Sequence, residues 1–340
     1  MRRVPWGVVV TSLYVACVLA VVVTTTRWGD EWWFATVMLF APRWVYATPM
    51  LLLVPVAAFS RHRLGSFGAL CVAALALAWF NDVHVSSGGP MASTQDRPLR
   101  VMTYNVGGGR LTPAAIVELV TEIDADVVGL EECGELDDAA HAAKGYAIRR
   151  SSSICLLTRL PIRVEDVRDP SDIQALSGSG AISRYQLEWS GRTFSLEVVH
   201  LETVREGLEE AMVKRFWRSD WQGARKMREV IDERAMESRI AFDWTHRAGD
   251  GVPTIVMGDF NMPVDSAIYR TYWSSFHNAL SERGSGHLVT KATRWHGLRI
   301  DHVLFDSGWT CRSAWIARDL GGDHRPVVAD FAWSGPSGRL

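Results

Sequence analysis

Apolar and polar positions divide the chain into two parts of unequal length. Residues 1–81 contain three apolar stretches with few charges, whereas the rest alternates between short apolar runs and polar segments. The first stretch, Trp6–Thr26, is uncharged and long enough to cross the hydrocarbon core of a membrane. The second is interrupted by prolines and the third is short. We therefore expect a transmembrane region over residues 1–81, with spans at about 6–26, 38–60 and 65–80.

Basic residues predict the orientation of these spans. Arg2 and Arg3 precede the first span, and Arg61 and Arg63 separate the second from the third. The positive-inside rule places both clusters in the cytoplasm, so three spans carry the rest of the chain out of it. We expect a multi-pass, membrane-integral protein. Two alternatives stay open: a cleaved signal peptide for the first stretch, and a buried helical hairpin in a soluble protein.

The pattern changes after the apolar part. Residues 82–97 are polar and rich in glycine, serine and proline, which is typical of a linker. "TPAAIVELVTEID" has helical spacing with Thr112 as N-cap, and residues 204–247 are charged and predict helix. Short β-rich runs predict strands: "LRVMTYNV", "ADVVGLEE", "ICLLTRL", "AISRYQLEW", "TFSLEVVHL", "PTIVMGDFN", "RIDHVLF" and "HRPVVADFAW". These elements predict an α/β domain over residues 98–334, with two packed sheets flanked by helices.

Charge and cysteine content narrow the function. The net charge is −2, and the part after residue 95 is acidic, with a net charge of about −5. The strongly basic stripe that marks tight nucleic-acid binding is missing from this part of the sequence. Cys133, Cys155 and Cys311 are scattered without zinc-type spacing. One disulfide bond among these three stays open.

Polar side chains recur where the predicted strands end. A single carboxylate, amide or imidazole there is most often a cap, a turn or a solvated strand end. A whole set at the ends of apolar strands is costly unless a cation or hydrogen-bond donors satisfy it. The set comprises Glu131, Glu132, His200, Asp259, Asn261, Asp301, Asp323 and His324. Taken together, these positions predict a catalytic or metal site.

Six blocks occur in a fixed order: "MTYNVGGG", "ADVVGLEE", "VVHLET", "IVMGDFNMP", "RIDHVLF" and "GGDHRPVVADF". They resemble the signature blocks of the endonuclease/exonuclease/phosphatase superfamily, the deoxyribonuclease I-like proteins. The resemblance implies a four-layer α/β sandwich with its active site at one rim. It also extends to membrane-anchored bacterial members with three N-terminal spans. By that likeness we expect the bacterial plasma membrane, with an extracytoplasmic catalytic domain.

The resemblance also implies roles for single residues. Glu132, Asn105 and Asp323 would bind Mg²⁺, with Mn²⁺ as the alternative; family spacing favours Glu132 over its neighbour Glu131. The metal would polarise a phosphate group. His324 would activate water, and Asp301 would orient its ring. Asp259 would position the water or stabilise the transition state, and Asn261 would donate to a phosphate oxygen. His200 would protonate the leaving group or stabilise the phosphoryl charge.

Three functions follow from these expectations. The first is a membrane-anchored, Mg²⁺-dependent phosphoesterase acting on a phosphate ester or pyrophosphate, including a lipid-linked one. Three-span bacterial members linked to glycopeptide resistance, which the architecture resembles, act on polyprenyl carriers. The second is an extracytoplasmic nuclease acting on DNA or RNA, whose phosphates the basic, aromatic stretch Val213–Arg228 could contact. The same stretch is also typical of a solvated amphipathic helix, and the acidic charge of this part of the chain counts against a nuclease. The third is a non-catalytic binding module. The sequence leaves the oligomeric state open.

Overall fold

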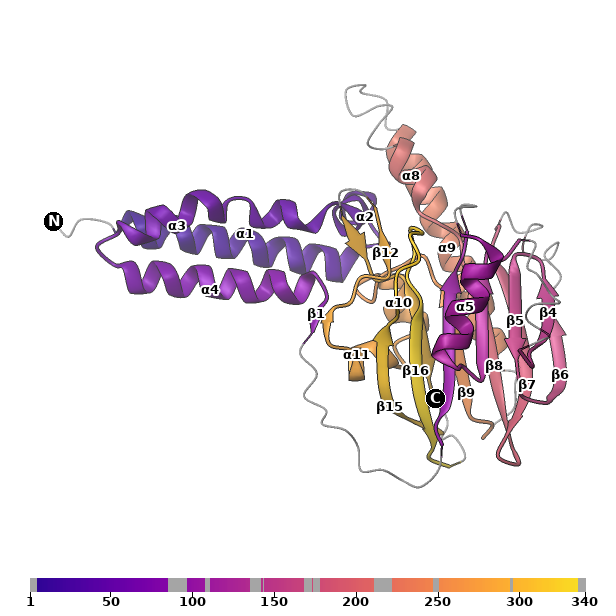
Figure 1. Ribbon diagram of the computed structural model, residues 1–340. Coiled ribbons are helices and arrows are strands. Elements are labelled where there is room, and N and C mark those ends of the chain that lie inside the picture. Colours follow the sequence, from indigo (N-terminus) through magenta and orange to yellow (C-terminus); the bar gives the residue numbers. More distant parts are fainter. Residues whose placement is uncertain are drawn as a thin grey trace.

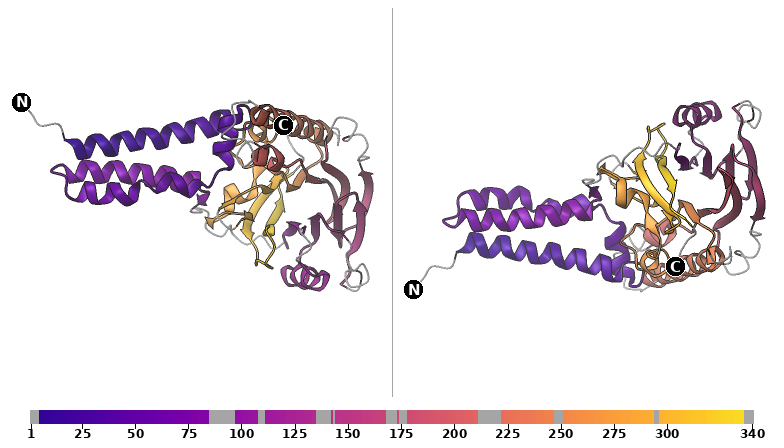
Figure 2. Two further views of the ribbon diagram at one scale, coloured as in Figure 1. Left: turned by 90° about the horizontal axis from the view of Figure 1, so that it is seen from above. Right: turned by 90° about the horizontal axis from the view of Figure 1, so that it is seen from below.

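The computed structural model describes residues 5–84, 97–107, 111–134, 142, 144–167, 173, 178–210, 222–246, 251–293 and 296–335. It consists of an N-terminal helical bundle that abuts one side of a two-sheet domain (Figure 1). The two further views in Figure 2 show the same arrangement, with the free end of the bundle pointing away from the sheets.

Three helical segments form the long axis of the bundle. They are α1 (Trp6–Trp28), η1 with α3 (Arg43–Ala47 and Met50–Ala58), and α4 (Arg63–Phe80). Helices α1 and α4 are long and apolar enough to cross a membrane. A third span is obtained only if helix α2 (Trp33–Phe40) is joined to residues 43–58, across a bend of 86°. The predicted span at 38–60 is therefore broken near Pro42, because proline disfavours helix in the residue that precedes it.

The exposed surface of the bundle is apolar. Tyr14, Val18 and Leu70 are buried between the helices, whereas Leu51 and Leu75 on the outer faces are 78% and 72% exposed. A continuous apolar surface of this kind is unfavourable in water and is expected of helices that lipid surrounds.

Two mixed six-stranded sheets pack face to face in the second part of the chain. The first has the order β15-β16-β2-β3-β5-β4 and the second the order β10-β14-β9-β8-β7-β6. The first comprises β2 (Leu99–Asn105), β3 (Val127–Glu131), β4 (Ala147–Ser151), β5 (Ile154–Thr158), β15 (Trp309–Ile316) and β16 (Val327–Trp333). The second comprises β6 (Ile162–Val167), β7 (Ala181–Trp189), β8 (Arg192–His200), β9 (Thr254–Asp259), β10 (His277–Asn278) and β14 (Asp301–Phe305). Their inner faces share one apolar core.

Helices cover the outer faces of the sheets. Helix α5 (Pro113–Ile123) packs on the first sheet, and the Thr112 side chain accepts a hydrogen bond from the Ala115 N–H, as an N-cap does. The second sheet is covered by α8 (Arg205–Glu209), α9 (Gln222–Thr245) and α10 (Ala267–Tyr272), while α11 (Ala279–Arg283) lies beside β15. The prediction of two packed sheets flanked by helices is confirmed. The helix predicted over 204–247 is present in its described parts; residues 211–221, and so most of the basic stretch, lie outside them.

Two short ribbons complete the fold. Strand β1 (Val83–His84) pairs with β11 (Gly286–His287), and β12 (Lys291–Ala292) pairs with β13 (Gly297–Leu298). Strand β1 lies in the segment predicted as a linker, so the first residues of that linker are paired with the second domain. Residues 85–96 lie outside the described ranges. The boundary at residue 98 stays a prediction.

Three buried ion pairs connect the bundle to the two-sheet domain, and we call this contact the junction. They are Asp30–Arg234 at 2.5 Å, Arg43–Asp265 at 3.1 Å and Asp82–Arg299 at 2.9 Å. Helix α2 also packs on α9. The bundle is thus held in one orientation on the domain.

Cys133 and Cys155 form a disulfide bond, and Cys311 is buried and free. The bond attaches the segment after β3 to β5. Cysteine spacing alone left this pairing open.

Candidate active site

One register row of the second sheet brings three predicted residues together. His200 is paired with Asp259 across β8 and β9, and Asp301 is paired with Asp259 across β14 and β9. Residues opposite one another in neighbouring strands point to the same face of a sheet. The three side chains therefore lie side by side at one rim.

The first sheet contributes Asn105 and Glu132 to the same rim. Asn105 ends β2, and its Nδ2 donates to Glu132 Oε1 at 3.2 Å and to Asp259 Oδ2 at 3.0 Å. Its Oδ1 accepts from the Gly107 N–H at 2.9 Å. A side chain at Gly107 would collide with Glu132, because a Cβ there would lie 1.8 Å from Oε2. The glycine after Asn105 thus leaves room for the carboxylate.

The adjacent glutamates have different environments. Glu131 ends β3, is fully buried and accepts a hydrogen bond from Thr103 Oγ1 at 2.7 Å. Burial raises its pKa well above the ordinary value, because the apolar surroundings disfavour the charged carboxylate. Glu132 lies just beyond the strand with a φ of 52°, and its side chain is 45% exposed. The left-handed residue turns Glu132 toward the rim, which places Glu132 rather than Glu131 beside Asn105.

His324 lies between two carboxylates, and we call Asp259, Asp301 and His324 the catalytic cluster. Its Nδ1 is 2.9 and 3.0 Å from the two Asp301 oxygens, and its Nε2 is 3.6 Å from Asp259 Oδ2. Because a carboxylate only accepts, Nδ1 carries the proton, and Nε2 is the acceptor when the ring is neutral. All three side chains are buried.

The charges of the catalytic cluster shift its titration. Burial lowers the pKa of His324, but Asp301 and Asp259 outweigh burial and raise that pKa to about 9. Burial and the neighbouring Asp259 raise the pKa of Asp301 despite His324. Burial also raises the pKa of Asp259, but His324, His200 and Lys291 together hold it below the ordinary value. The two carboxylates share one imidazole, so the three residues by themselves carry excess negative charge and attract cations.

Lys291 is a site residue that sequence reasoning missed. Its Nζ is 2.7 Å from His324 Nε2 and 3.6 Å from Asp323 Oδ2. An ammonium only donates, so this contact forms with a neutral imidazole whose Nε2 accepts. Lys291 therefore opposes the two carboxylates and favours the neutral ring that a general base requires. The only sequence signal was a lysine in the ten residues before "RIDHVLF".

The other predicted residues lie around this cluster. His200 Nε2 is 3.7 Å from Glu132 Oε1, and Nδ1 is 3.4 Å from Ser153 Oγ. Asn261 has a φ of 51°, and its N–H donates to Asp259 Oδ1 at 2.8 Å. Its Nδ2 donates to the Leu201 carbonyl, so this amide also holds the turn after β9. Asp323 is more exposed and reaches the cluster through Lys291.

The rim has the chemistry of a site for a hard cation. Asp259, Asp301 and His324 offer ligand atoms within 4.8 Å of one another, and Glu132 adds a further carboxylate beside Asn105. Oxygen ligands of this kind suit Mg²⁺, which keeps several of its waters. The residues present therefore fit a divalent cation.

Comparisons with known proteins identify a family and a shared fold. The model of the endonuclease/exonuclease/phosphatase family matches residues 102–324. Similar solved structures include D. rerio TDP2 complexed with a single-strand DNA product (16% identity, TM-score 0.52, covering 70% of this chain and 100% of that one). A mannosyl-6-phosphatase from Bacteroides thetaiotaomicron is 15% identical (TM-score 0.51, 69% and 100% covered). A family member from Beutenbergia cavernae is also 15% identical (TM-score 0.51, 71% and 73% covered).

At these identities the solved structures share the fold alone with this chain. A search of curated proteins found no match.

Proposed function

The chain belongs to the endonuclease/exonuclease/phosphatase family, and we propose that it is a membrane-anchored, Mg²⁺-dependent phosphoesterase whose substrate is a membrane lipid carrying a phosphate ester or pyrophosphate. Family members are hydrolases that act on phosphate ester bonds, so the expectation of a hydrolase is confirmed. Such enzymes generally use divalent metals such as Mg²⁺. The anchor, the lipid and the residue roles below are the proposal.

In this proposal, His324 is the general base. Its Nε2 accepts a proton from water, and Asp301 holds the ring by Nδ1 and stabilises the imidazolium that forms. Asp259 positions the water, and Lys291 donates to a phosphate oxygen once Nε2 is occupied by the water. His200, whose Nε2 lies 3.7 Å from Glu132 Oε1, assists the leaving oxygen.

Glu132, Asn105 and Asp323 would hold the Mg²⁺ ion, which would polarise the phosphate and neutralise charge that develops on its oxygens. Asn105 also connects Glu132 to Asp259. To test this set, Mn²⁺ binding is titrated calorimetrically to wild type, Glu132→Gln and His324→Gln. Weaker binding in Glu132→Gln alone supports it, whereas equal or greater loss in His324→Gln would assign the ion to the catalytic cluster.

Several features support an extracytoplasmic location of the catalytic domain. Arg61 and Arg63 lie at the end of the bundle that is distant from the domain, which the positive-inside rule assigns to the cytoplasm. Trp28, Trp44 and Trp79 are 45%, 50% and 54% exposed and lie near the opposite end, as interfacial tryptophans do. The Cys133–Cys155 bond is of the kind that persists in oxidising compartments.

The proposal of a lipid substrate is supported mainly by the contacts of one side chain, Arg234. Arg234 pairs with Asp30 at the end of the bundle, and its other nitrogen donates to the Asn261 carbonyl at 2.9 Å. A single buried guanidinium thus joins the bundle to the turn after Asp259. The site is fixed beside the bundle rather than carried on a free tether, which raises its effective concentration toward lipid phosphates.

The test is hydrolysis by the full-length chain in detergent micelles with Mg²⁺. A polyprenyl pyrophosphate, a panel of phospholipids and plasmid DNA are compared, with His324→Ala and chelator as controls. Mg²⁺-dependent release of phosphate from a lipid, lost in the variant, is the expected result. Cleavage of DNA alone would replace the proposal with the nuclease. Inactivity on every substrate would contradict it.

A further inference from the structure

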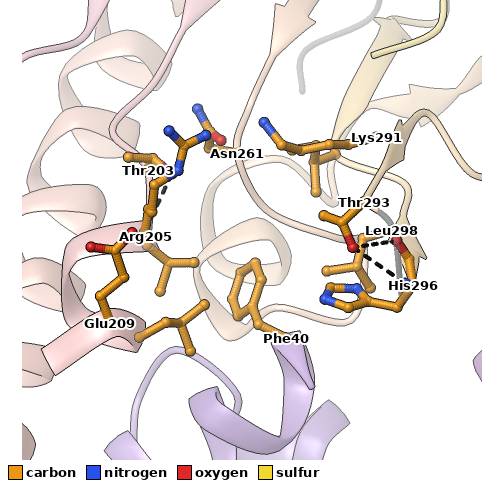
Figure 3. A pocket seen from close by; sticks show the side chains of 12 residues that line it. Phe40, Thr203, Arg205, Glu209, Asn261, Lys291, Thr293, His296 and Leu298 are labelled. Atoms are coloured by element: carbon orange, nitrogen blue, oxygen red, sulfur yellow. Dashed lines mark hydrogen bonds between the residues drawn. The ribbon is translucent and has the colours of Figure 1, made fainter. Parts of the chain in front are cut away.

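A pocket of about 190 Å³ lies between the catalytic rim and the end of the helical bundle. Figure 3 shows its two ends: Asn261 and Lys291 lie at one, and Phe40 of α2 at the other. Lys291 is the residue that contacts His324. The pocket is therefore continuous with the candidate active site, and its opposite wall belongs to the N-terminal apolar region.

The two ends of the pocket differ in polarity. The wall away from the catalytic rim is mainly apolar, with Phe40, Val204, Leu208, Leu298 and Ile300, and its polar residues include Glu209 and His296 (Figure 3). At the catalytic end, the side chains of Arg205 and Lys291 both point toward the side on which Asn261 lies (Figure 3). The cavity thus has two cationic side chains beside the candidate active site and a mainly apolar wall beyond them. This distribution is complementary to an anionic head group joined to an apolar chain.

We propose that this pocket binds the first part of the hydrocarbon chain of a lipid whose phosphate occupies the catalytic rim. The inference rests on the proposed lipid phosphoesterase function and assigns a subsite to it. Aliphatic carbon in this wall would gain contact with an acyl or isoprenoid chain and lose contact with water.

The volume of the pocket limits the length of lipid hydrocarbon chain that it can bind. Pockets that enclose a whole drug-sized ligand measure about 300–1,000 Å³, and this one is smaller. It holds a segment of the chain next to the phosphate, while the rest of the lipid stays in the membrane. The position of Phe40 supports this path, because α2 follows α1 directly at the end of the bundle where Trp28 and Trp32 are exposed.

Enzyme kinetics on a chain-length series tests the subsite. Full-length protein in micelles is given prenyl pyrophosphates that share one reacting group, from dimethylallyl to farnesyl. Burial of only two methylene groups gives a ratio of kcat/KM of about tenfold in favour of the longer chain. In Leu208→Trp, which fills the pocket, and Leu208→Asp, which makes it polar, that ratio falls toward one.

Matched substitutions serve as controls. Val164→Trp and Val164→Asp make the same kinds of change at a residue of β6 that is 46% exposed and lies outside the pocket. These variants keep the wild-type ratio. A wild-type ratio near one, or a full ratio in both Leu208 variants, would overturn the subsite even if hydrolysis is efficient.

A binding measurement separates this inference from the proposed function. His324→Ala protein is irradiated with a phosphatidic acid that carries a diazirine near the head-group end of its acyl chain, and the labelled peptides are identified by mass spectrometry. Labelling of peptides that contain Phe40 or Leu298, reduced in His324→Ala/Leu208→Trp, supports the pocket. Labelling confined to the outer faces of the bundle would refute it. Pocket labelling without any lipid hydrolysis by wild type would retain the subsite and reject the catalytic proposal.

Discussion

The catalytic cluster and the junction are both made of buried charged side chains, but their charges are balanced differently. At the junction, each of Asp30, Asp82 and Asp265 has its own arginine. In the catalytic cluster, Asp259 and Asp301 share His324. The junction is close to neutral, whereas the cluster has excess negative charge.

This difference separates a structural site from a chemical one. A buried charge is costly unless it is paired, so the paired junction can hold two domains together without needing a ligand. The catalytic cluster is instead stabilised when it binds a cation or a proton, because either one neutralises its excess negative charge. Burial and Asp259 raise the pKa of Asp301, and the two carboxylates raise that of His324 against the effect of burial. Shifted pKa values of this kind are typical of sites that perform acid–base chemistry.

Removal of His324 gives the largest expected effect on chemistry. His324→Gln lowers kcat by about 10²- to 10⁴-fold because no general base remains. The melting temperature near neutral pH also falls, because Asp301 and Asp259 lose the imidazolium that pairs with them. Steady-state kinetics and thermal unfolding of the full chain in micelles measure both. His246→Gln, at an exposed histidine outside the rim, is the control; comparable activity in the two variants would remove His324 from the mechanism.

Disruption of one ion pair at the junction tests whether this region serves stability rather than chemistry. Arg234→Met leaves Asp30 buried without a partner and lowers the free energy of unfolding by about 3–5 kcal/mol. The double change Asp30→Leu with Arg234→Met recovers most of this loss, because no unpaired charge remains. Chemical denaturation in micelles provides the measurement. A double variant no more stable than the single one would contradict a balanced junction.

The exposed pair Arg325–Asp319 is the control for that comparison. Arg325→Met is expected to cost less than about 1 kcal/mol, because solvent screens both charges.

Lys291 is expected to have an intermediate effect. Lys291→Met lowers kcat/KM by about 10- to 100-fold, the loss of one hydrogen bond to a charged group. Removal of the ammonium also raises the pKa of His324, so the acidic limb of the pH–rate profile moves to higher pH. Lys144→Met provides a matched control at an exposed lysine. An unshifted limb would show that Lys291 acts on the substrate alone.

The free energy of unfolding should depend on pH with opposite sign for the catalytic cluster and the junction. Each titrating group changes it by at most about 1.4 kcal/mol per pH unit. His324 has a raised pKa in the folded state, so its contribution is complete below 6.5 and is lost as the pH rises toward about 9. Burial raises the pKa of Asp82, but Arg299, His84 and Arg43 outweigh it and lower that pKa. The contribution of Asp82 is therefore complete above 3.8 and is lost as the pH falls below it.

Thermal unfolding of the chelator-treated protein across pH checks both signs. His324→Gln should flatten the alkaline decline only, and Asp82→Asn the acidic decline only. Alkaline stability that is the same with and without His324 would count against its raised pKa.

Local residue patterns predicted much of the fold and part of the site. The strand runs such as "TIVMGD" and "RIDHVLF" form β9 and β14, because their apolar side chains are buried. Thr112 caps α5 as its sequence position indicates. Asp259, Asp301 and His324 lie at or near the ends of predicted strands, and their side chains meet at one rim of the sheets. Roles within the site remain predictions until the variants are measured.

Other features depend on contacts between distant segments. The break near Pro42 separates α2 from α3 and lets α2 pack on α9 rather than extend the middle span. The sequence shows the proline but not the surface that receives the helix. Likewise, Glu132 is turned toward the rim by a left-handed residue just beyond β3, and strand alternation alone could not decide between the two glutamates.

The sequence by itself determined the apolar helices, the alternating strands and the polar residues at the strand ends, because these depend on local periodicity and side-chain type. Only the tertiary structure decided that Lys291 contacts His324, that Cys133 pairs with Cys155, and that Arg234 joins Asp30 to Asn261. Asp30 and Arg234 are separated by 204 positions. Their pairing is set by the burial of two opposite charges at one interface, a requirement that exists only once the bundle and the sheets have packed together.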